Sequence, residues 1–429
     1  DMRGQKYVLQ VAPEDCTGCN LCVEVCPAKD RQDPSIKAIN MMSRLEHVEE
    51  EKVNYDFFLD LPEIDRNKLE RIDIRTSQLI KPLFEFSGAC AGCGETPYVK
   101  LVSQLFGDRM IIANATGCSS IYGGSAPTCP YTVNEDGHGP AWANSLFEDN
   151  AEFGLGFRLT VDQHRARVMR LLEQFADKIP AELNDALHAE ATPDVRRAQV
   201  AELRHALQGV EGAEQLLTDA DALVEKSIWL IGGDGWAYDI GYGGIDHVMA
   251  QNRDVNLMVL DTEVYSNTGG QASKATPTAA IAKFAASGKR TKKKDLGRIF
   301  MTYGYIYVAQ VCIGADKAQT LKALAEAEAY PGPSIVIAYC PCINHGIKTG
   351  MGLSQMEAKH AVDCGYWALY RYNPQLVGTG VNPFTLDSKE PTGSYRDFIT
   401  GETRYRTLQK MFPQDAEMLF ARAEEEAKE

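Results

Sequence analysis

Long hydrophobic runs, an excess of basic residues and internal repeats are all missing from this 429-residue sequence. No apolar stretch approaches the roughly 20 residues that span a bilayer, and the first residues, DMRGQKY, hold no signal-peptide core. Lysine and arginine number 44 against 59 aspartates and glutamates, and the resulting net charge of -15 disfavours nucleic acid and anionic membranes as partners. These absences predict a cytoplasmic globular protein of roughly two or three domains.

Twelve cysteines stand out in this otherwise ordinary composition. Tight cysteine groups without secretory features indicate reduced thiolates that bind metal, and not a disulfide scaffold. The run CTGCNLCVEVCP has the spacing C-x2-C-x2-C-x3-C-P, in which Cys16, Cys19 and Cys22 would hold one 4Fe–4S cube and Cys26 a second. Both cubes need further ligands, for which the fifteen preceding residues leave no room. Since position 1 is not methionine either, we expect the sequence to be part of a longer chain.

Five short aliphatic stretches predict buried strands: 109–116, 227–233, 255–262, 306–312 and 334–340. Segments of helix length separate them, which is typical of an α/β domain with a parallel sheet flanked by helices. We place this domain at residues 61–360.

Three other regions differ from the α/β pattern. Residues 1–60 combine the cysteine run with β-prone stretches at 7–16 and 35–42, and predict a partial α+β ferredoxin-like domain. Apolar residues at helical spacing predict an inserted helical hairpin at 161–221. Residues 361–429 are rich in Tyr, Pro and Gly, and predict an irregular tail.

The strand at 227–233 runs into Gly233, Asp234 and Gly235. Glycines at a strand end let the backbone close on a pyrophosphate, and a carboxylate is a hard oxygen ligand for magnesium. A second strand ends about 25 residues later, where Thr262 can offer a hydroxyl and Val264 a carbonyl to the same ion. A turn that serves only strand-to-helix geometry is the alternative, and the second strand end argues against it.

Three further stretches supply cysteines: GACAGCGETPY holds Cys90 and Cys93, ATGCSSIYGG holds Cys118, and YCPCINHGI holds Cys340 and Cys342. Four thiolates from three loops would form a closed site for a 4Fe–4S cube or for structural zinc. Zinc carries no electrons, whereas the N-terminal run implies an electron path. We therefore favour the cube.

The sequence resembles a known family. GDG followed by roughly 25 to 30 residues and an Asn pair is the thiamine diphosphate motif, and here Asp261 and Thr262 occupy the Asn-pair positions. Nearly the whole chain is similar to the C-terminal third of pyruvate:ferredoxin (flavodoxin) oxidoreductase, through the stretches CPAKD, GACAGCGETPY, TGCSSIYGGSAPTCPYT, WANSLFEDNAEFG, GDGWAYDIGYGGIDH and DTEVYSNTGGQASKATP.

This resemblance implies a thiamine diphosphate-binding fold and a role for particular residues. Magnesium on the diphosphate would be held by Asp234, Thr262 and the Val264 carbonyl, with Asn267 as the catalytic residue beside the reactive ring. The remaining cofactor-binding residues would be Glu95, Cys118, Gly233, Gly235 and Trp236. The cluster nearest thiamine would be held by Cys90, Cys93, Cys118 and Cys342, with Cys340 as the weaker alternative to Cys342 because the family's last ligand precedes a stretch similar to INHGI.

The activity that the resemblance implies is oxidative decarboxylation of pyruvate with coenzyme A to acetyl-CoA and CO2. Electrons would leave one at a time, through the cube held entirely here and two cubes shared with upstream cysteines, to ferredoxin or flavodoxin. Upstream domains would complete the enzyme. The full enzyme would be a homodimer and would work under anaerobic conditions. The alternatives are another 2-oxoacid as substrate, an electron-transfer subunit without catalysis, or a non-redox thiamine decarboxylase, which would not use eight clustered cysteines.

The remaining features have simpler interpretations. Cys129, Cys312, Cys340 and Cys364 are expected to be small buried side chains. The lysines of GKRTKKKDLG fit a solvated loop better than a docking site for an acidic ferredoxin. His138 and His345 lie near predicted sites and are expected to be hydrogen-bonded.

Overall fold

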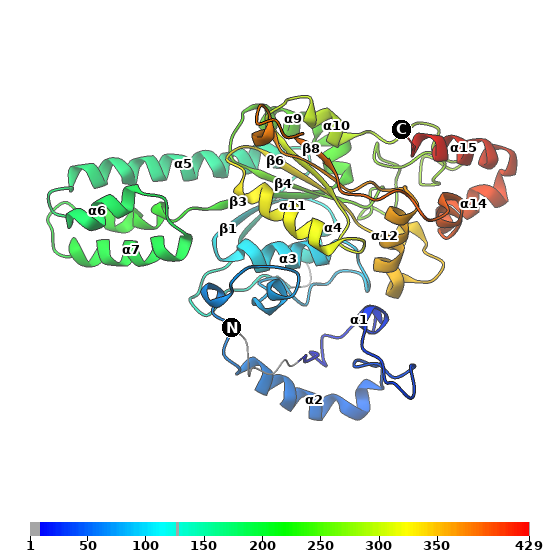
Figure 1. The fold of residues 1–429 in the computed structure, drawn as a ribbon, viewed down its shortest axis with the longest axis horizontal. Coiled ribbons are helices and arrows are strands. Elements are labelled where there is room, and N and C mark those ends of the chain that lie inside the picture. The colour runs from blue at the N-terminus through cyan, green and yellow to red at the C-terminus, as the bar shows by residue number, and fades with distance from the viewer. Residues whose placement is uncertain (1–8, 126–127, 429) are drawn as a thin grey trace.

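The computed structural model describes residues 9–125 and 128–428, and one eight-stranded sheet lies at its centre (Figure 1). The strands are β1 (Met110–Ala115), β2 (Ala141–Ser145), β3 (Ser227–Gly233), β4 (Asn256–Asp261), β5 (Tyr307–Val311), β6 (Ser334–Tyr339), β7 (Tyr370–Tyr372) and β8 (Phe384–Leu386). Their order is β2-β1-β3-β4-β6-β5-β7-β8. The first six in this order are parallel, and β7 and β8 are antiparallel at one edge.

All five predicted strands are present, and they are the five central neighbours β1, β3, β4, β6 and β5. Their side chains alternate between two buried clusters. In β4, for example, Leu257 and Val259 join one cluster while Met258 and Leu260 join the other. A strand covered on both faces is apolar at every position, which is why these stretches were recognisable.

Helices cover both faces of the sheet (Figure 1). The buried cluster on the first face includes side chains of α9 (Tyr242–Ala250), α10 (Leu296–Met301) and α12 (Ser354–Asp363), and it continues into α13 (Tyr395–Thr400), α14 (Thr403–Met411) and α15 (Pro413–Glu426). The second face carries α3 (Thr96–Phe106) and α11 (Lys317–Ala329). The expected α/β architecture with flanking helices is therefore confirmed.

The inserted segment is larger than the predicted hairpin. It consists of α5 (Asn150–Gln174), α6 (Ala181–His188), α7 (Pro193–Ala206) and α8 (Glu214–Asp219), and α5 to α7 project beyond the sheet in Figure 1. A separate core that includes Val168, Leu172, Val200 and Leu203 holds these helices together. The prediction began at residue 161 because the first turns of α5 pack on the sheet and do not share the insert's apolar pattern.

At both ends of the described chain the secondary structure differs from the expected elements. Between residues 9 and 60 the structure has α1 (Leu21–Val25), α2 (Arg44–Leu59) and a single bridge between Lys29 and Lys37, but no strand. Residues 7 and 8 of the first β-prone stretch lie outside the described part. The expected irregular tail instead contains β7 and β8, which extend the sheet at one edge, and α13 to α15, whose apolar side chains join the first buried cluster. No helix among the described residues has the length and apolarity needed to cross a membrane.

Candidate cofactor and cluster site

The carboxyl ends of β1, β3, β4 and β6 lie at one edge of the sheet, since these strands are adjacent and parallel. The chain continues from them into the segments that contain Cys118, Asp234, Thr262 and Cys342. In open α/β sheets, ligands bind at this edge. Residues more than 200 positions apart in the sequence therefore meet in one region.

Asp234 is the centre of a compact set of oxygen atoms at this edge. Its Oδ1 accepts a hydrogen bond from Thr262 Oγ1 at 3.1 Å, and its Oδ2 accepts one from Ser273 Oγ at 2.6 Å. Thr262 Oγ1 also lies 3.1 Å from the Val264 carbonyl oxygen. The predicted trio of Asp234, Thr262 and Val264 is thus brought together.

The spacing of these three oxygens fits a magnesium ion. An octahedral ion with metal–oxygen distances of 2.0–2.1 Å sets neighbouring ligand oxygens about 3 Å apart. The carboxylate itself is fully buried, and both burial and the nearby Asp261 raise the pKa of Asp234 well above its usual range. A divalent cation would stabilise the ionised form that this environment disfavours.

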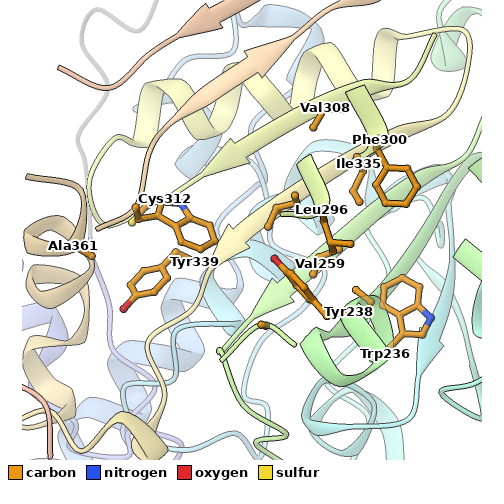
Figure 2. Close-up of a cluster of buried hydrophobic side chains, with 14 of the residues drawn as sticks. Trp236, Tyr238, Val259, Leu296, Phe300, Val308, Cys312, Ile335, Tyr339 and Ala361 are labelled. Atoms are coloured by element: carbon orange, nitrogen blue, oxygen red, sulfur yellow. The ribbon is translucent and has the colours of Figure 1, made fainter. Parts of the chain in front are cut away.

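The glycines around Asp234 leave room for a ligand and for close packing. A Cβ on Gly233 would meet only the Leu260 carbonyl oxygen, at 3.9 Å, so the backbone there is open to a phosphate. A Cβ on Gly235 would collide with the Tyr265 ring. Trp236 differs from the expectation, since its side chain lies in the first-face core (Figure 2). Only its backbone can face a cofactor.

The loop after β4 connects the oxygen cluster to the cysteines. Cys118 Sγ lies 3.3 Å from Ser266 Oγ, and Ser266 stands between the magnesium-type ligands and Asn267. Asn344 donates a hydrogen bond to the Ser266 carbonyl at 3.4 Å and another to Cys342 Sγ at 3.5 Å. Asn267 is exposed on the same loop. The residues predicted to bind the diphosphate and those predicted to hold the cluster are therefore connected through this loop.

Cys90 and Cys93 lie in the turn before α3, and this turn contacts the segment that carries Cys342. The Gly94 amide donates a hydrogen bond to the Pro341 carbonyl at 3.0 Å, and a Cβ on Gly94 would lie 2.5 Å from the Pro341 nitrogen. Pro341 directly precedes Cys342, so the two cysteine segments are in contact. Only glycine permits this approach.

The four thiols influence one another electrostatically. Burial raises the pKa of Cys118 to about 12 and that of Cys342 to about 11, and neighbouring thiols and Glu95 add to both rises. The pKa of Cys93 is also raised, chiefly by burial. Because cluster ligands are thiolates, iron binding is what would favour deprotonation here.

The other cysteines lie outside this group. Cys340 is fully buried, and its thiol donates to the Ala338 carbonyl. Cys342 is only partly buried, and its Sγ accepts a hydrogen bond from Asn344. The greater accessibility of Cys342 favours it as the fourth ligand. Cys312 and Cys364 are buried, as predicted, but Cys129 is exposed.

Glu95 is an isolated carboxyl beside the cysteines. It is 3% exposed, and its Oε2 has no hydrogen-bond partner. Burial raises the pKa of Glu95 to about 7, and the nearby Tyr122 hydroxyl offsets only part of the rise. An unpartnered buried carboxyl is costly and is typical of a functional position. The expected place of Glu95 in a cofactor pocket fits this environment.

A short helix, η8 (Met351–Leu353), links the N-terminal cysteine run to this site. Ser354 Oγ donates to the carbonyl of Gly92, which lies between Cys90 and Cys93, at 2.8 Å. On its other side, a Cβ on Gly352 would lie 2.6 Å from the Cys19 carbonyl oxygen. The two cysteine groups are therefore separated by a single turn of helix.

Sequence reasoning missed several supporting residues. Lys293 pairs with Asp261 at 2.8 Å and Glu263 at 3.1 Å, while Arg404 pairs with Glu263 and Glu402, both at 2.7 Å. These buried pairs hold Glu263, whose φ is +62°, in the left-handed region between Thr262 and Val264.

His345 is hydrogen-bonded, as expected, through Nε2 to the Thr262 carbonyl at 2.7 Å. Ser266 and Ser273 lie in the quoted stretch DTEVYSNTGGQASKATP, but no spacing rule singled them out. His138 lies in an exposed turn, where its backbone amide donates to Asn134 Oδ1.

Comparison with known proteins defines the class of this chain in agreement with the geometry. Residues 205–338 match the family described as thiamine pyrophosphate enzyme, C-terminal TPP binding domain. Residues 9–29 match the 4Fe-4S binding domain. The chain thus combines a thiamine pyrophosphate-binding domain with an iron–sulfur domain.

Individual proteins are similar to the chain over nearly its whole length. The chain is 68% identical over 420 residues to the probable pyruvate-flavodoxin oxidoreductase of Escherichia coli (strain K12), covering 98% of this chain and 36% of the relative. It is 57% identical over 439 residues to the pyruvate:ferredoxin oxidoreductase of Moorella thermoacetica, covering 99% and 37%. The chain is similar to these pyruvate oxidoreductases over nearly all of its own length and spans about a third of the length of these relatives.

A solved structure gives a much weaker match. The 2-oxoglutarate:ferredoxin oxidoreductase from Magnetococcus marinus, with 2-oxoglutarate, coenzyme A and succinyl-CoA bound, matches 65% of this chain and 70% of its own, with a TM-score of 0.38 and 16% identity. This likeness is too distant to carry an argument.

Proposed function

We propose that the chain is the cofactor-binding part of an enzyme that oxidatively decarboxylates pyruvate with coenzyme A to acetyl-CoA and CO2, and passes the electrons to ferredoxin or flavodoxin. The names and high identity of the relatives support this activity. The observation that carries the proposal is the 3.3 Å contact between Cys118 and Ser266, which brings a cluster ligand against the loop that would hold thiamine diphosphate.

When bound, thiamine diphosphate would supply the carbanion that attacks the keto carbon and the electron sink that receives the electrons left by CO2. The chain's residues would bind and orient this group. Asp234, Thr262 and the Val264 carbonyl would hold magnesium on its diphosphate, with Gly233 and Gly235 at the open strand end and Asn267 beside the ring. Glu95 would line the cofactor pocket beside the cysteines.

The electron path would begin at the cube held by Cys90, Cys93, Cys118 and Cys342. It would continue past η8 to the two cubes that Cys16, Cys19, Cys22 and Cys26 share with upstream cysteines. The contacts of Gly92 and Cys19 with η8 support this order. All twelve cysteines are free, as expected of thiols that bind metal in a reducing environment. Upstream domains would supply the rest of the substrate site in a homodimer.

The alternatives are less well supported. An electron-transfer subunit without catalysis would have no use for the buried Asp234 set or for the unpartnered Glu95. Another 2-oxoacid as substrate would require a different substrate pocket. An activity assay of the full-length protein that compares pyruvate with longer 2-oxoacids would test this alternative.

The test uses the full-length protein that contains this chain, purified without oxygen. We expect about twelve irons per chain, as three 4Fe–4S clusters require, and magnesium-dependent binding of thiamine diphosphate by calorimetry. Asp234→Asn is expected to weaken this binding at least 100-fold without changing the iron content. Asp185→Asn, an exposed aspartate of the insert, is the matched control. Wild-type protein that binds no thiamine diphosphate, or zinc in place of the third cluster, would contradict the proposal.

A further inference from the structure

Lys293 lies beside the proposed magnesium ligands, and the proposed function gives it no role. It belongs to the stretch GKRTKKKDLG, for which the sequence predicted a solvated loop. Its ammonium instead lies 2.8 Å from Asp261 Oδ2 and 3.1 Å from Glu263 Oε1. These two carboxylates are almost completely buried and flank Thr262, so the cation lies at the turn that carries the magnesium ligands.

Asp261 shapes this turn through its side chain. Its Oδ1 accepts a hydrogen bond from the Glu263 amide at 3.0 Å, and its Oδ2 accepts one from the Tyr238 hydroxyl at 2.6 Å. The first bond fixes the peptide between Thr262 and Glu263, and Glu263 takes a left-handed φ of +62°. Val264 follows directly, so the direction of its carbonyl depends on this bond.

Aromatic rings hold the ammonium group of Lys293 in place. It lies 4.9 Å from the centre of the Trp367 ring and 5.6 Å from the centre of the Tyr238 ring, which is within the range of cation–π attraction. Both rings belong to the first-face core, in which Figure 2 shows Tyr238. The cation therefore has a defined position, unlike a solvent-exposed lysine.

Asp261 depends on this cation more than Glu263 does. Glu263 has a second cationic partner, because Arg404 lies 2.7 Å from its Oε2. A buried carboxylate that loses its partner is left with an uncompensated charge. An unpaired Asp261 would repel the diphosphate and would be drawn toward a magnesium ion, away from the Glu263 amide.

We propose that Lys293 is a positioning residue for the magnesium site. It neutralises Asp261 and keeps that carboxylate on the Glu263 amide. The turn then sets the Thr262 hydroxyl and the Val264 carbonyl at the spacing that magnesium requires. This inference rests on the proposed function, in which these two oxygens hold the metal on thiamine diphosphate.

Calorimetry on the anaerobic full-length protein tests the proposal, with thiamine diphosphate as the ligand at several magnesium concentrations. Lys293→Met is expected to weaken the binding at least tenfold and to raise the magnesium concentration needed for half-maximal binding. Lys293→Arg keeps the charge and should weaken the binding by less than about threefold. Lys359→Met, which removes the partner of Asp363 on the surface of α12, is the control.

A double variant separates neutralisation of charge from packing. Asp261→Asn keeps an oxygen that can accept the Glu263 amide and has no charge to neutralise. Asp261→Asn combined with Lys293→Met should therefore bind thiamine diphosphate within about threefold of the wild type. If Lys293 served only for packing, the double variant would bind no more tightly than Lys293→Met.

The outcomes separate this inference from the proposed function. Unchanged thiamine diphosphate affinity in Lys293→Met, or no recovery in the double variant, would overturn the role of Lys293 and leave the proposed function standing. Wild-type protein that binds no thiamine diphosphate would overturn both. If Lys293→Met does not fold with its full iron content, the affinities of the double variant and of Lys293→Arg decide, and a tenfold loss in both contradicts the proposal.

Discussion

Replacing Glu95 by glutamine should stabilise the cofactor-free protein at neutral and alkaline pH. Glu95 is buried with one carboxylate oxygen unpartnered, and its pKa is about 7 against 4.5 for an ordinary glutamate. A carboxyl that binds its proton more tightly when folded opposes folding above pH 7 by about 3 kcal/mol for this difference. Glutamine has nearly the same shape and cannot ionise.

The sign of the pH dependence follows from the same values. Below pH 4.5 both the folded and the unfolded carboxyl are protonated, so ionisation does not affect stability. Between pH 4.5 and 7 the unfolded chain ionises first, and the wild-type protein loses stability as the pH rises. Glu95→Gln should therefore be more stable than the wild type by about 3 kcal/mol at pH 8 and by under about 1 kcal/mol at pH 5.

Urea unfolding followed by tryptophan fluorescence measures this difference, because all four tryptophans lie in the α/β body. Glu417→Gln, which changes an exposed glutamate paired with Arg396, is the control and should shift stability by less than about 1 kcal/mol. The same Glu95→Gln change should weaken thiamine diphosphate binding at least tenfold, since function and stability oppose each other at such a site. A variant no more stable than the wild type at pH 8 would refute the reasoning.

Three further changes test neighbouring parts of the site. Gly235→Ala should weaken thiamine diphosphate binding at least tenfold by calorimetry, because its Cβ collides with the Tyr265 ring. Arg404→Met leaves Glu263 and Glu402 without their shared cation, and should cost about 3–5 kcal/mol in urea unfolding, against under about 1 kcal/mol for the exposed Arg422→Met. Gly352→Val should slow electron transfer to the N-terminal clusters in stopped-flow absorbance without changing the iron content, since its Cβ meets the Cys19 carbonyl, whereas Gly156→Val at an open position of α5 should not.

The central strands were predictable because two helical layers bury them on both faces. β2 was missed because it is an edge strand whose residues are partly or fully exposed, so its sequence AWANS lacks a continuous apolar run. β7 and β8 have three residues each, too few to leave a pattern. The helices α14 and α15 do have apolar residues at helical spacing, including Leu408, Leu419 and Phe420, but the Tyr, Pro and Gly residues earlier in the tail obscure this pattern.

The residues of the site also divide into those that the sequence could predict and those that depend on tertiary contacts. Asp234 and Thr262 could be paired from the sequence, because two adjacent parallel strands end there and topology alone brings their ends together. Ser266, Ser273 and Asn344 reach the site through loops whose path depends on tertiary contacts. Trp236 directly follows the GDG motif, and only the packing of Gly232 and Gly241 against its ring turns the side chain into the core.

Electron paramagnetic resonance on rapidly frozen samples tests most directly whether the oxygen cluster of Asp234 and the cysteine group act as one centre. The full-length protein, loaded with clusters and thiamine diphosphate, is mixed with pyruvate in the absence of coenzyme A. We predict the signal of a reduced 4Fe–4S cluster in the wild type and in Asp185→Asn, and none in Asp234→Asn at equal iron content. Cluster reduction by pyruvate in Asp234→Asn, or none in wild-type protein that has thiamine diphosphate bound, would contradict the account.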